Sequence, residues 1–296
     1  MDIYNINYDN FDWENYIDIN VNNDLKKNNI LDKDSAWRHW KNHGIKEERP
    51  LTITNNTNIH NGRLGNLFFV NMVMHFIAVK YNLKCRYKYF DYFKKLGIEL
   101  YIGKNEYKKN IKINNSNFLQ LIKNNHYRKS NIIIDRESCY QTSEFVVFLK
   151  LYFNIAYNKL KIINNNMFKD RYKNNNDLFI HVRLGDIKDR TDNIEKYYEK
   201  ALLELNFDKG YISSDSINDK ICQNMIRKYK LNVIDKSELE TIMFASTCNI
   251  IILSGGTFSW LIGFFSFFAC KIYYPNMKNR WYGDIFNFVN WVSIDF

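Results

Sequence analysis

Four apolar segments in the second half of the chain each lead into a helical pattern, and this alternation constrains the fold more than any other feature. The segments cover residues 178–182, 210–215, 231–234 and 249–253. Strands that alternate with helices form a parallel, doubly wound sheet. The first segment, LFIHV, is apolar enough to be a strand buried on both faces of such a sheet. We therefore expect an α/β fold.

Clusters of polar residues close three of these segments, at residues 181–186, 213–215 and 254–259. In an open α/β sheet, ligands bind beyond the carboxyl ends of the strands. The guanidinium of Arg183 is planar and always charged, so it can bind two oxygens of a pyrophosphate at once. A surface ion pair between Arg183 and Asp186 is the alternative for the first cluster taken alone. Three clusters at one edge of a sheet favour a binding site for an anion.

The segment before Pro50 is predicted to be a small helical module, residues 1–50. One short helix is expected near Trp13, and a second is expected to begin at Asp34 or Ser35 as its N-cap and to stop at Gly44. His39 and His43 lie four residues apart, which is a spacing that a metal could use. No cysteine or third histidine accompanies them, so a structural role is the better interpretation.

Residues 51–168 are predicted to form a first domain and residues 169–296 a second, with polar segments at 164–166 and 173–177 as the connection. The first domain is expected to start with a strand at residues 51–54, followed by GRLGN at 62–66 and a helix over 67–79. Gly62 and Gly65 would let the backbone approach a ligand, and the helix N-terminus favours phosphate. Taken alone, the two glycines are better explained by a plain tight turn.

The formal net charge of +10 favours anionic partners, which include nucleotide phosphates, nucleic acid and acidic surfaces. Basic residues are scattered among aromatics without a known nucleic-acid-binding pattern, so we expect no nucleic-acid partner. Five cysteines without a CxxC pair indicate buried free thiols rather than zinc or disulfides.

The start of the chain has no apolar signal-peptide region, and the apolar stretch 250–270 is interrupted by small polar residues. That stretch is predicted to be strand, turn and buried helix rather than a membrane span. These features favour a soluble, cytoplasmic protein. The frequent Asn, Lys and Ile residues indicate an AT-rich coding sequence, as in some viruses and microbes.

Five stretches resemble motifs of the inverting fucosyltransferases, closest to glycosyltransferase family 11, the α-1,2-fucosyltransferases. The family's HVRRGD is similar to HVRLGD at residues 181–186, and its YIFSDD-like segment to YISSDS at 211–216. Its acidic helix, C-N-x-I-I and TFSWW are similar to residues 238–260. Its GRLGNQM and GYFQSxxYF are similar to residues 62–67 and 139–145. The segment before Pro50 resembles a helical module appended to bacterial and viral glycan-processing proteins.

This resemblance implies a GT-B architecture, in which two Rossmann-like domains face a cleft and the second holds the sugar nucleotide. It implies transfer of L-fucose from GDP-β-L-fucose to a glycan hydroxyl, with inversion at the anomeric carbon and an α-1,2 linkage. The co-substrates would be a GDP-sugar and a glycan acceptor. Because no DxD motif stands at a strand end, we expect no divalent metal and no other cofactor.

The resemblance also assigns roles to individual residues. Arg183 would stabilise the charge that the departing GDP leaves on its β-phosphate, and Asp186 would hold Arg183 or contact the nucleotide. His181 would contact the nucleotide or orient Arg183; a histidine that is simply satisfied at a strand end is the alternative. The other residues expected to bind the donor are Gly65, Asn66, Ser214, Asp215, Glu238, Gly256, Thr257, Phe258 and Ser259. No general base is assigned; Asp135, Glu144 and Asp186 are the candidates, and a structural role is the better interpretation of each.

Three positions depart from the family pattern. Leu184 stands in place of the second arginine, residues 254–257 read SGGT in place of the family's NST, and Leu261 replaces a tryptophan. The first change removes one cation expected next to the donor. These departures leave two alternatives open: a transferase for another GDP-deoxyhexose such as rhamnose, and a catalytically inactive glycan-binding protein.

Overall fold

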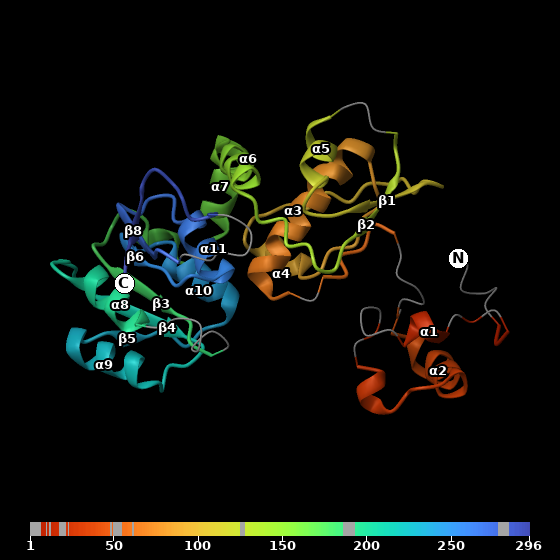
Figure 1. The fold of residues 1–296 in the computed structure, drawn as a ribbon, viewed down its shortest axis with the longest axis horizontal. Helices are drawn as coiled ribbons and strands as arrows, with labels where there is room; N and C mark the ends of the chain where they lie inside the picture. The colour runs from red at the N-terminus through yellow and green to blue at the C-terminus, as the bar shows by residue number, and fades with distance from the viewer. Residues whose placement is uncertain are drawn as a thin grey trace. The chain divides into compact units, whose positions relative to one another are not determined.

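The computed structural model describes residues 7–9, 11, 13–17, 22, 24–47, 49, 55–60, 62–124, 128–185, 193–277 and 284–296. The chain divides into two compact units (Figure 1). The first comprises residues 1–61, 70–88 and 101–138, and the second comprises residues 62–69, 89–100 and 139–296. The domain boundaries predicted at residues 50 and 168 stay predictions. The strand predicted at residues 51–54 and the candidate residue Asp186 lie outside the described residues.

The second unit contains a six-stranded sheet whose paired strands are all parallel, in the order β5-β4-β3-β6-β7-β8. Its strands are β3 (Leu178–Val182), β4 (Gly210–Ser214), β5 (Asn232–Val233), β6 (Ile250–Ile252), β7 (Lys271–Pro275) and β8 (Trp291–Ile294). Numbered within the sheet, this order is 3-2-1-4-5-6, which is that of doubly wound dinucleotide-binding sheets. The predicted α/β class with a parallel sheet is confirmed.

Strand β3 lies at the centre of this sheet, between β4 and β6. All five of its residues are buried, as the apolar run predicted. Leu178 is paired with Gly210 of β4 on one side and with Ile250 of β6 on the other. The strand order reverses between β3 and β6, and this is the position where open α/β sheets bind ligands.

Alternate residues of β3 face opposite sides of the sheet, because successive side chains of a strand point in opposite directions. Leu178, Ile180 and Val182 join a buried cluster with α8 (Ile194–Leu202) and α9 (Lys220–Tyr229). On the other side, Phe179 makes an edge contact with Phe244 of α10 (Glu238–Ala245), with ring centroids 6.5 Å apart. Helices therefore cover both faces (Figure 1).

The first turns of α3 (Leu64–Tyr81) bring a large aromatic cluster into the second unit. Phe69 packs on Trp260 of α11 (Thr257–Phe265) at 4.8 Å between ring centroids, and Phe68 contacts Phe153 of α6 (Ser143–Asn154) at 6.0 Å. Trp260 is fully buried. Burial of a side chain of this size contributes about 2–3 kcal/mol. The remaining helical elements of this unit are α4 (Phe90–Lys95), α7 (Ala156–Asn165) and η4 (Lys169–Arg171).

The polar segment that was expected to connect two domains is packed within the second unit. Asn166 is buried, and its side-chain amide donates to the carbonyl oxygen of Met243 at 2.8 Å and to the hydroxyl of Ser246 at 3.2 Å. Arg171 forms a 2.7 Å ion pair with the buried Asp177. These polar residues therefore form hydrogen bonds and an ion pair inside the second unit.

The first unit contains a two-stranded parallel sheet of β1 (Asn110–Ile113) and β2 (Asn131–Ile134). Residues 56–58 lie beside it: the amide of Asn56 donates to the carbonyl of Ile132 in β2, and Thr57 forms an isolated parallel bridge with Arg86. The rest of α3 and α5 (Phe118–Lys123) complete this part.

The N-terminal helices are α1 (Trp13–Tyr16), η2 (Lys26–Asn28), α2 (Lys33–His39) and η3 (Trp40–Gly44). Their core is aromatic, with Phe11 5.3 Å from Tyr16 and 5.5 Å from Trp40 between ring centroids. The predicted N-cap at Asp34 or Ser35 is wrong. Asp32 caps α2, because its carboxylate accepts from the amide of Ser35 while the Ser35 hydroxyl closes a capping box.

Helix α3 is the one described helix whose length and composition would allow it to cross a membrane, with a mean hydropathy of 1.3. Of this window, 78% is buried inside the protein, as in the core helix of a soluble protein. The stretch 250–270 forms β6 and α11, as predicted. All five cysteines are free; four are buried, and Cys270 is exposed rather than buried.

Candidate functional site

Three neighbouring strand ends of the second unit carry the polar clusters that were identified from the sequence. Arg183 follows β3, Asp215 follows β4, and Ser254 follows β6 after Leu253. Because β4, β3 and β6 are adjacent and parallel, their carboxyl ends lie at one edge of the sheet. The expected convergence of the three clusters is confirmed.

His181 joins the ends of β3 and β6. Its Nδ1 lies 3.0 Å from the hydroxyl oxygen of Ser254, and its ring centroid is 5.1 Å from that of Phe258. Burial lowers the pKa of His181 to about 4; Arg183 acts in the same direction and Asp215 opposes it. The imidazole is therefore neutral at pH 7. It can position the strand ends or share a hydrogen bond, but it brings no positive charge.

Arg183 lies directly against the backbone at the start of α11. An ideal Cβ built on Gly256 would stand 2.8 Å from Nη1 and 3.7 Å from Cζ of Arg183. Any side chain at residue 256 would displace the guanidinium, so the close approach depends on glycine. Gly256 is the N-cap of α11, and a helix N-terminus carries a partial positive charge. The guanidinium and this helix end therefore present positive charge together.

The start of α3 reaches the same place. A Cβ on Gly65 would be 2.6 Å from the backbone nitrogen of Phe258 and 2.6 Å from the carbonyl carbon of Thr257. The side-chain oxygen of Asn66 accepts from the hydroxyl of Thr257 at 2.9 Å and from the amide of Gln141 at 2.9 Å. Two helix N-termini thus meet backbone to backbone, and this convergence can bind an anion.

Asp215, Ser259 and Ser214 are used to fix the loops at this edge. The Asp215 carboxylate accepts from the backbone amides of Leu184 at 2.9 Å and Gly185 at 3.2 Å. The Ser259 hydroxyl accepts from the amide of Ser254 at 2.7 Å, and that of Ser214 accepts from the amide of Ser216 at 2.9 Å. These side chains were predicted to contact the donor. In the structure they accept hydrogen bonds from backbone amides of the loops that would surround it.

Leu184 belongs to the hydrophobic core. It is 1% exposed and lies in the same buried cluster as Leu178, Ile180 and Val182. The alternation of β3 thus continues past its last residue, which puts residue 184 on the α8 and α9 side and leaves Arg183 on the side of His181. The cation that the resemblance placed here would have to leave that core to reach an anion.

Glu238 begins α10 and is exposed. Loss of surrounding solvent raises the pKa of the Glu238 carboxyl, and the neighbouring Arg63 opposes this shift. The pair places one residue from the turn before α3 beside the start of α10. Both residues are exposed, and the role predicted for Glu238 stays a prediction.

Three residues that help to build the site were not among its predicted members: Gln141, Tyr197 and Tyr198. Ser254, which contacts His181, stood in the predicted polar cluster 254–259 without an assigned role. The hydroxyl of Tyr197 donates to the carbonyl of Leu253 at 2.7 Å, and that of Tyr198 to the carbonyl of His181 at 3.0 Å. Both tyrosines are fully buried. The sequence contains no signal for these hydrogen bonds, because two tyrosines in an amphipathic helix are typical of an ordinary buried face. Gln141 stood in a matched motif and could have been included.

The arrangement is suited to holding a phosphate or pyrophosphate by one guanidinium and the N-termini of two helices. Among the residues that the structure describes, no group of three or more His, Cys, Asp or Glu side chains could hold a metal ion. His39, one of the two histidines noted in the N-terminal module, contacts the Tyr16 hydroxyl at 2.8 Å through its Nδ1.

Comparisons of this chain with family models, with curated proteins and with solved structures gave no match.

Proposed function

We propose that this protein is an inverting, metal-independent glycosyltransferase that moves L-fucose from GDP-β-L-fucose to a glycan hydroxyl. The observation that carries the proposal is the position of the Arg183 guanidinium against Gly256, where α11 begins and the start of α3 converges. A nucleoside diphosphate carries the negative charge that this set of groups can bind. The order of the sequence motifs supports guanine and fucose as the base and the sugar.

In the proposed reaction, the oxygen of an acceptor hydroxyl attacks the anomeric carbon from the face opposite the nucleotide. The bond between that carbon and the β-phosphate oxygen breaks, and its electron pair leaves with GDP. Arg183 and the α11 N-terminus stabilise the charge that grows on that oxygen. Removal of a single preorganised donor of this kind costs about 10²–10³ in turnover. The acceptor proton passes to a base, for which Asp135, Glu144 and Asp186 remain candidates.

His181 and Asp215 support Arg183 in this proposal. His181 is neutral and bonded to Ser254, so it keeps the β3 and β6 ends together without adding charge. Asp215 holds the amides of Leu184 and Gly185, the two residues that follow Arg183. The arginine therefore stands on a turn that is fixed on both sides.

One experiment distinguishes fucose transfer from its two alternatives, which are transfer of another GDP-deoxyhexose and glycan binding without catalysis. Thermal unfolding is followed with GDP, GDP-fucose, GDP-rhamnose, a UDP-sugar or an oligonucleotide, and GDP release is then measured with a glycan acceptor. Selective stabilisation by GDP compounds supports the proposal, since a ligand at 100 times its Kd stabilises by about 2.7 kcal/mol. Stabilisation without release of GDP indicates a binding protein. Stabilisation by the oligonucleotide alone contradicts the proposal.

The matched variants are Arg183→Ala and Arg227→Ala. Arg227 lies on α9, is exposed, and donates to the carbonyl of Gln223 and to the side chain of Asn224. We expect Arg183→Ala to lose about 10²-fold or more in turnover and Arg227→Ala to behave as the unmodified protein. Turnover should be unchanged by EDTA; its loss would contradict the metal-independent mechanism.

The GT-B architecture and a cytoplasmic location belong to the same proposal. The parallel strands β1 and β2 of the first unit are compatible with a second Rossmann-like domain. A crystal structure with GDP-fucose would test the architecture, because the sugar nucleotide should contact residues of the second unit. Fractionation of cells that express the full chain would test the location.

A further inference from the structure

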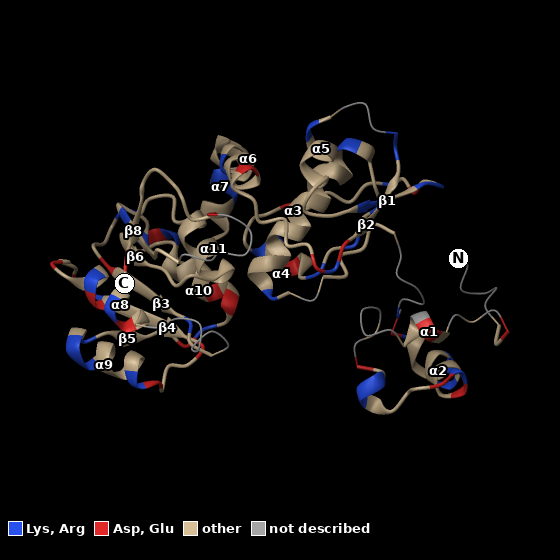
Figure 2. Ribbon diagram, in the orientation of Figure 1, with Lys and Arg blue, Asp and Glu red and all other residues tan. Residues whose placement is uncertain are grey.

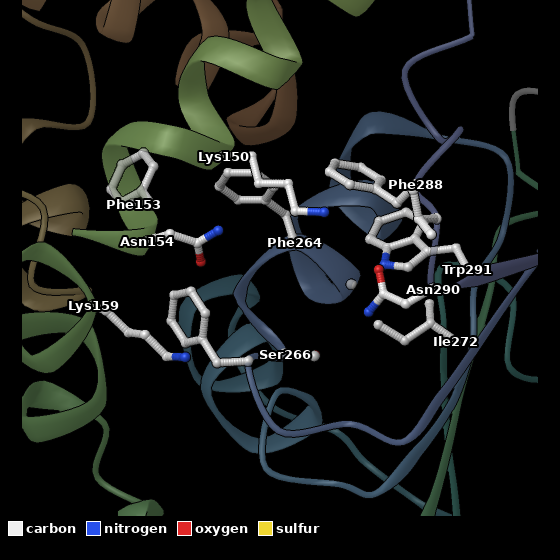
Figure 3. Close-up of a pocket in the computed structure, with 13 residues that line it drawn as sticks. Lys150, Phe153, Asn154, Lys159, Phe264, Ser266, Ile272, Phe288, Asn290 and Trp291 are labelled. Atoms are coloured by element: carbon white, nitrogen blue, oxygen red, sulfur yellow. The ribbon is translucent and has the colours of Figure 1, made fainter. Parts of the chain in front are cut away.

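The second unit contains a pocket of about 320 Å³ at a different edge of the sheet from the strand ends described above (Figure 3). It is lined by residues at the starts of β7 and β8, at the end of α11, and on α6 and α7. Since the strands are parallel, the starts of β7 and β8 lie opposite the carboxyl ends that carry Arg183. This pocket is therefore separate from the candidate donor site.

Aromatic rings form one wall of the pocket. Phe288 and Trp291 are 4.5 Å apart between ring centroids, and Phe264 is 6.2 Å from Phe288. All three are nearly buried, at 8–9% exposure, yet each lines the opening. Flat carbon surfaces of this kind bind the apolar C–H face of a ring compound by dispersion and water exclusion.

Two lysines supply positive charge beside these rings. The Nζ of Lys150 lies 5.0 Å from the ring centroid of Phe288, and that of Lys159 lies 5.1 Å from Phe267. Both lysine side chains are half-buried, which weakens the screening of their charge. None of the described lining residues is acidic. The pocket thus favours a ligand that carries a negative charge.

Two asparagines complete the lining. Asn154, at the end of α6, and Asn290, just before β8, are exposed at the rim, and Figure 3 shows their amides around the same opening as Lys150. An amide both donates and accepts hydrogen bonds, which matches hydroxyl groups better than it matches a purely apolar ligand. Pockets for small ligands span about 300–1,000 Å³, so a volume at the lower end suits a single sugar ring rather than a nucleotide.

We propose that this pocket binds a saccharide ring that carries an acidic group, either a carboxylate or a phosphate ester. The ring lies on Phe288 and Trp291, its hydroxyls bond to Asn154 and Asn290, and the acidic group lies between Lys150 and Lys159. Such a site would hold an acidic glycan on the second unit whether or not the protein transfers fucose.

The test uses isothermal titration with two pairs of ligands that differ in charge. A galacturonate tetramer is compared with its fully methyl-esterified form, and glucose 6-phosphate is compared with glucose. We expect at least one acidic ligand to bind more tightly than its neutral partner. Saturating GDP should leave that affinity unchanged, because the donor site lies at the opposite edge. Displacement by GDP, or equal binding of both members of each pair, would overturn the proposal.

The variants separate the pocket from general attraction to a basic protein. In the double variant Lys150→Gln and Lys159→Gln, the affinity for the acidic ligand should fall about tenfold. The matched double variant Lys196→Gln and Lys220→Gln removes the same charge from exposed residues of α8 and α9 and should leave it unchanged. Asn290→Asp places a negative charge at the exposed rim and should also weaken binding. Equal losses in the two double variants would refute a specific site.

Discussion

The side-chain oxygen of Asn66 accepts a hydrogen bond from the hydroxyl of Thr257 at 2.9 Å, across 191 residues of sequence. This bond joins the first turn of α3 to the first turn of α11. The side-chain amide of Gln141 donates to the same oxygen, so the side-chain oxygen of Asn66 accepts two hydrogen bonds. The bond therefore keeps two positively polarised helix ends together at the proposed anion site.

Replacement of Thr257 by valine should weaken GDP binding. Thr257→Val keeps the shape of the side chain and removes the donor, which costs about 1 kcal/mol of stability. Because the two helix ends then lose their link, we expect the affinity for GDP, measured by isothermal titration, to fall about five- to tenfold. Thr241→Val is the control, since the Thr241 hydroxyl in α10 donates to the carbonyl of Lys236, which lies just before that helix. If both variants bind GDP as the unmodified protein does, the link has no role in binding.

Alanine at the two glycines of the site should have different consequences. In Gly65→Ala the new Cβ would meet backbone atoms of Thr257 and Phe258 at 2.6 Å, and backbone cannot move aside cheaply. We expect a loss of about 2–3 kcal/mol in the free energy of unfolding. In Gly256→Ala the Cβ meets the end of the flexible Arg183 side chain at 2.8 Å, so stability should change by less than about 1 kcal/mol while turnover falls. Chemical denaturation and a GDP-release assay measure the two effects. The reverse ranking of stability would contradict the packing described.

Removal of the Asp215 carboxylate should loosen the turn that carries Arg183. In the structure it accepts from the amides of Leu184 and Gly185. Because the two amides lose their acceptor, we expect Asp215→Ala to increase their rate of hydrogen exchange about tenfold or more. The amides of β3 should stay protected. Asp215→Asn keeps one acceptor oxygen and should show an intermediate effect. Unchanged exchange at Leu184 and Gly185 in the alanine variant would mean that other contacts hold the turn.

Much of the second sheet could be predicted because its strands are buried on both faces and read as short apolar runs. The bounds of β3 agree with the run 178–182, and the capping box of α10 needs only Ser237 and Glu240, three residues apart in the sequence. The convergence of residues after β3, β4 and β6 follows from parallel topology, which places all carboxyl ends at one edge. These features depend on local pattern and on a general rule of connection.

Other features depend on contacts that no local pattern contains. Asn166 and Asn175 stand in polar segments typical of a linker, and only the fold shows that they bond to α10 and its following turn. Asp32, rather than Asp34 or Ser35, caps α2. The sequence alone could not identify this residue, because all three are polar residues suited to an N-cap. The site's use of Gln141 and Tyr198 depends on distant partners in the same way.

The buried His181 should make stability depend on pH. Its pKa is lowered to about 4 from the usual 6.5, so the unfolded chain takes up a proton at a higher pH than the folded protein does. The stabilisation is complete above pH 6.5 and is lost as the pH falls toward 4, by about 3 kcal/mol in all. His181→Asn should flatten this part of the curve of unfolding free energy against pH, and the exposed control His43→Asn should not. Parallel curves for all three proteins would contradict burial of a neutral His181.

Introduction of an arginine at residue 184 tests the alternative that the protein is an inactive binding protein. If Leu184 marked lost chemistry, Leu184→Arg would raise turnover. The Leu184 side chain instead lies in the core with Val182 and Tyr198, so the variant would place a charge among apolar groups. We expect a loss of about 3–5 kcal/mol in the free energy of unfolding and no gain in turnover. Leu184→Met conserves the volume and should cost about 1.5 kcal/mol at most. A stable, more active Leu184→Arg protein would show that residue 184 can turn toward the donor, and that the proposed anion site was incomplete with Arg183 alone.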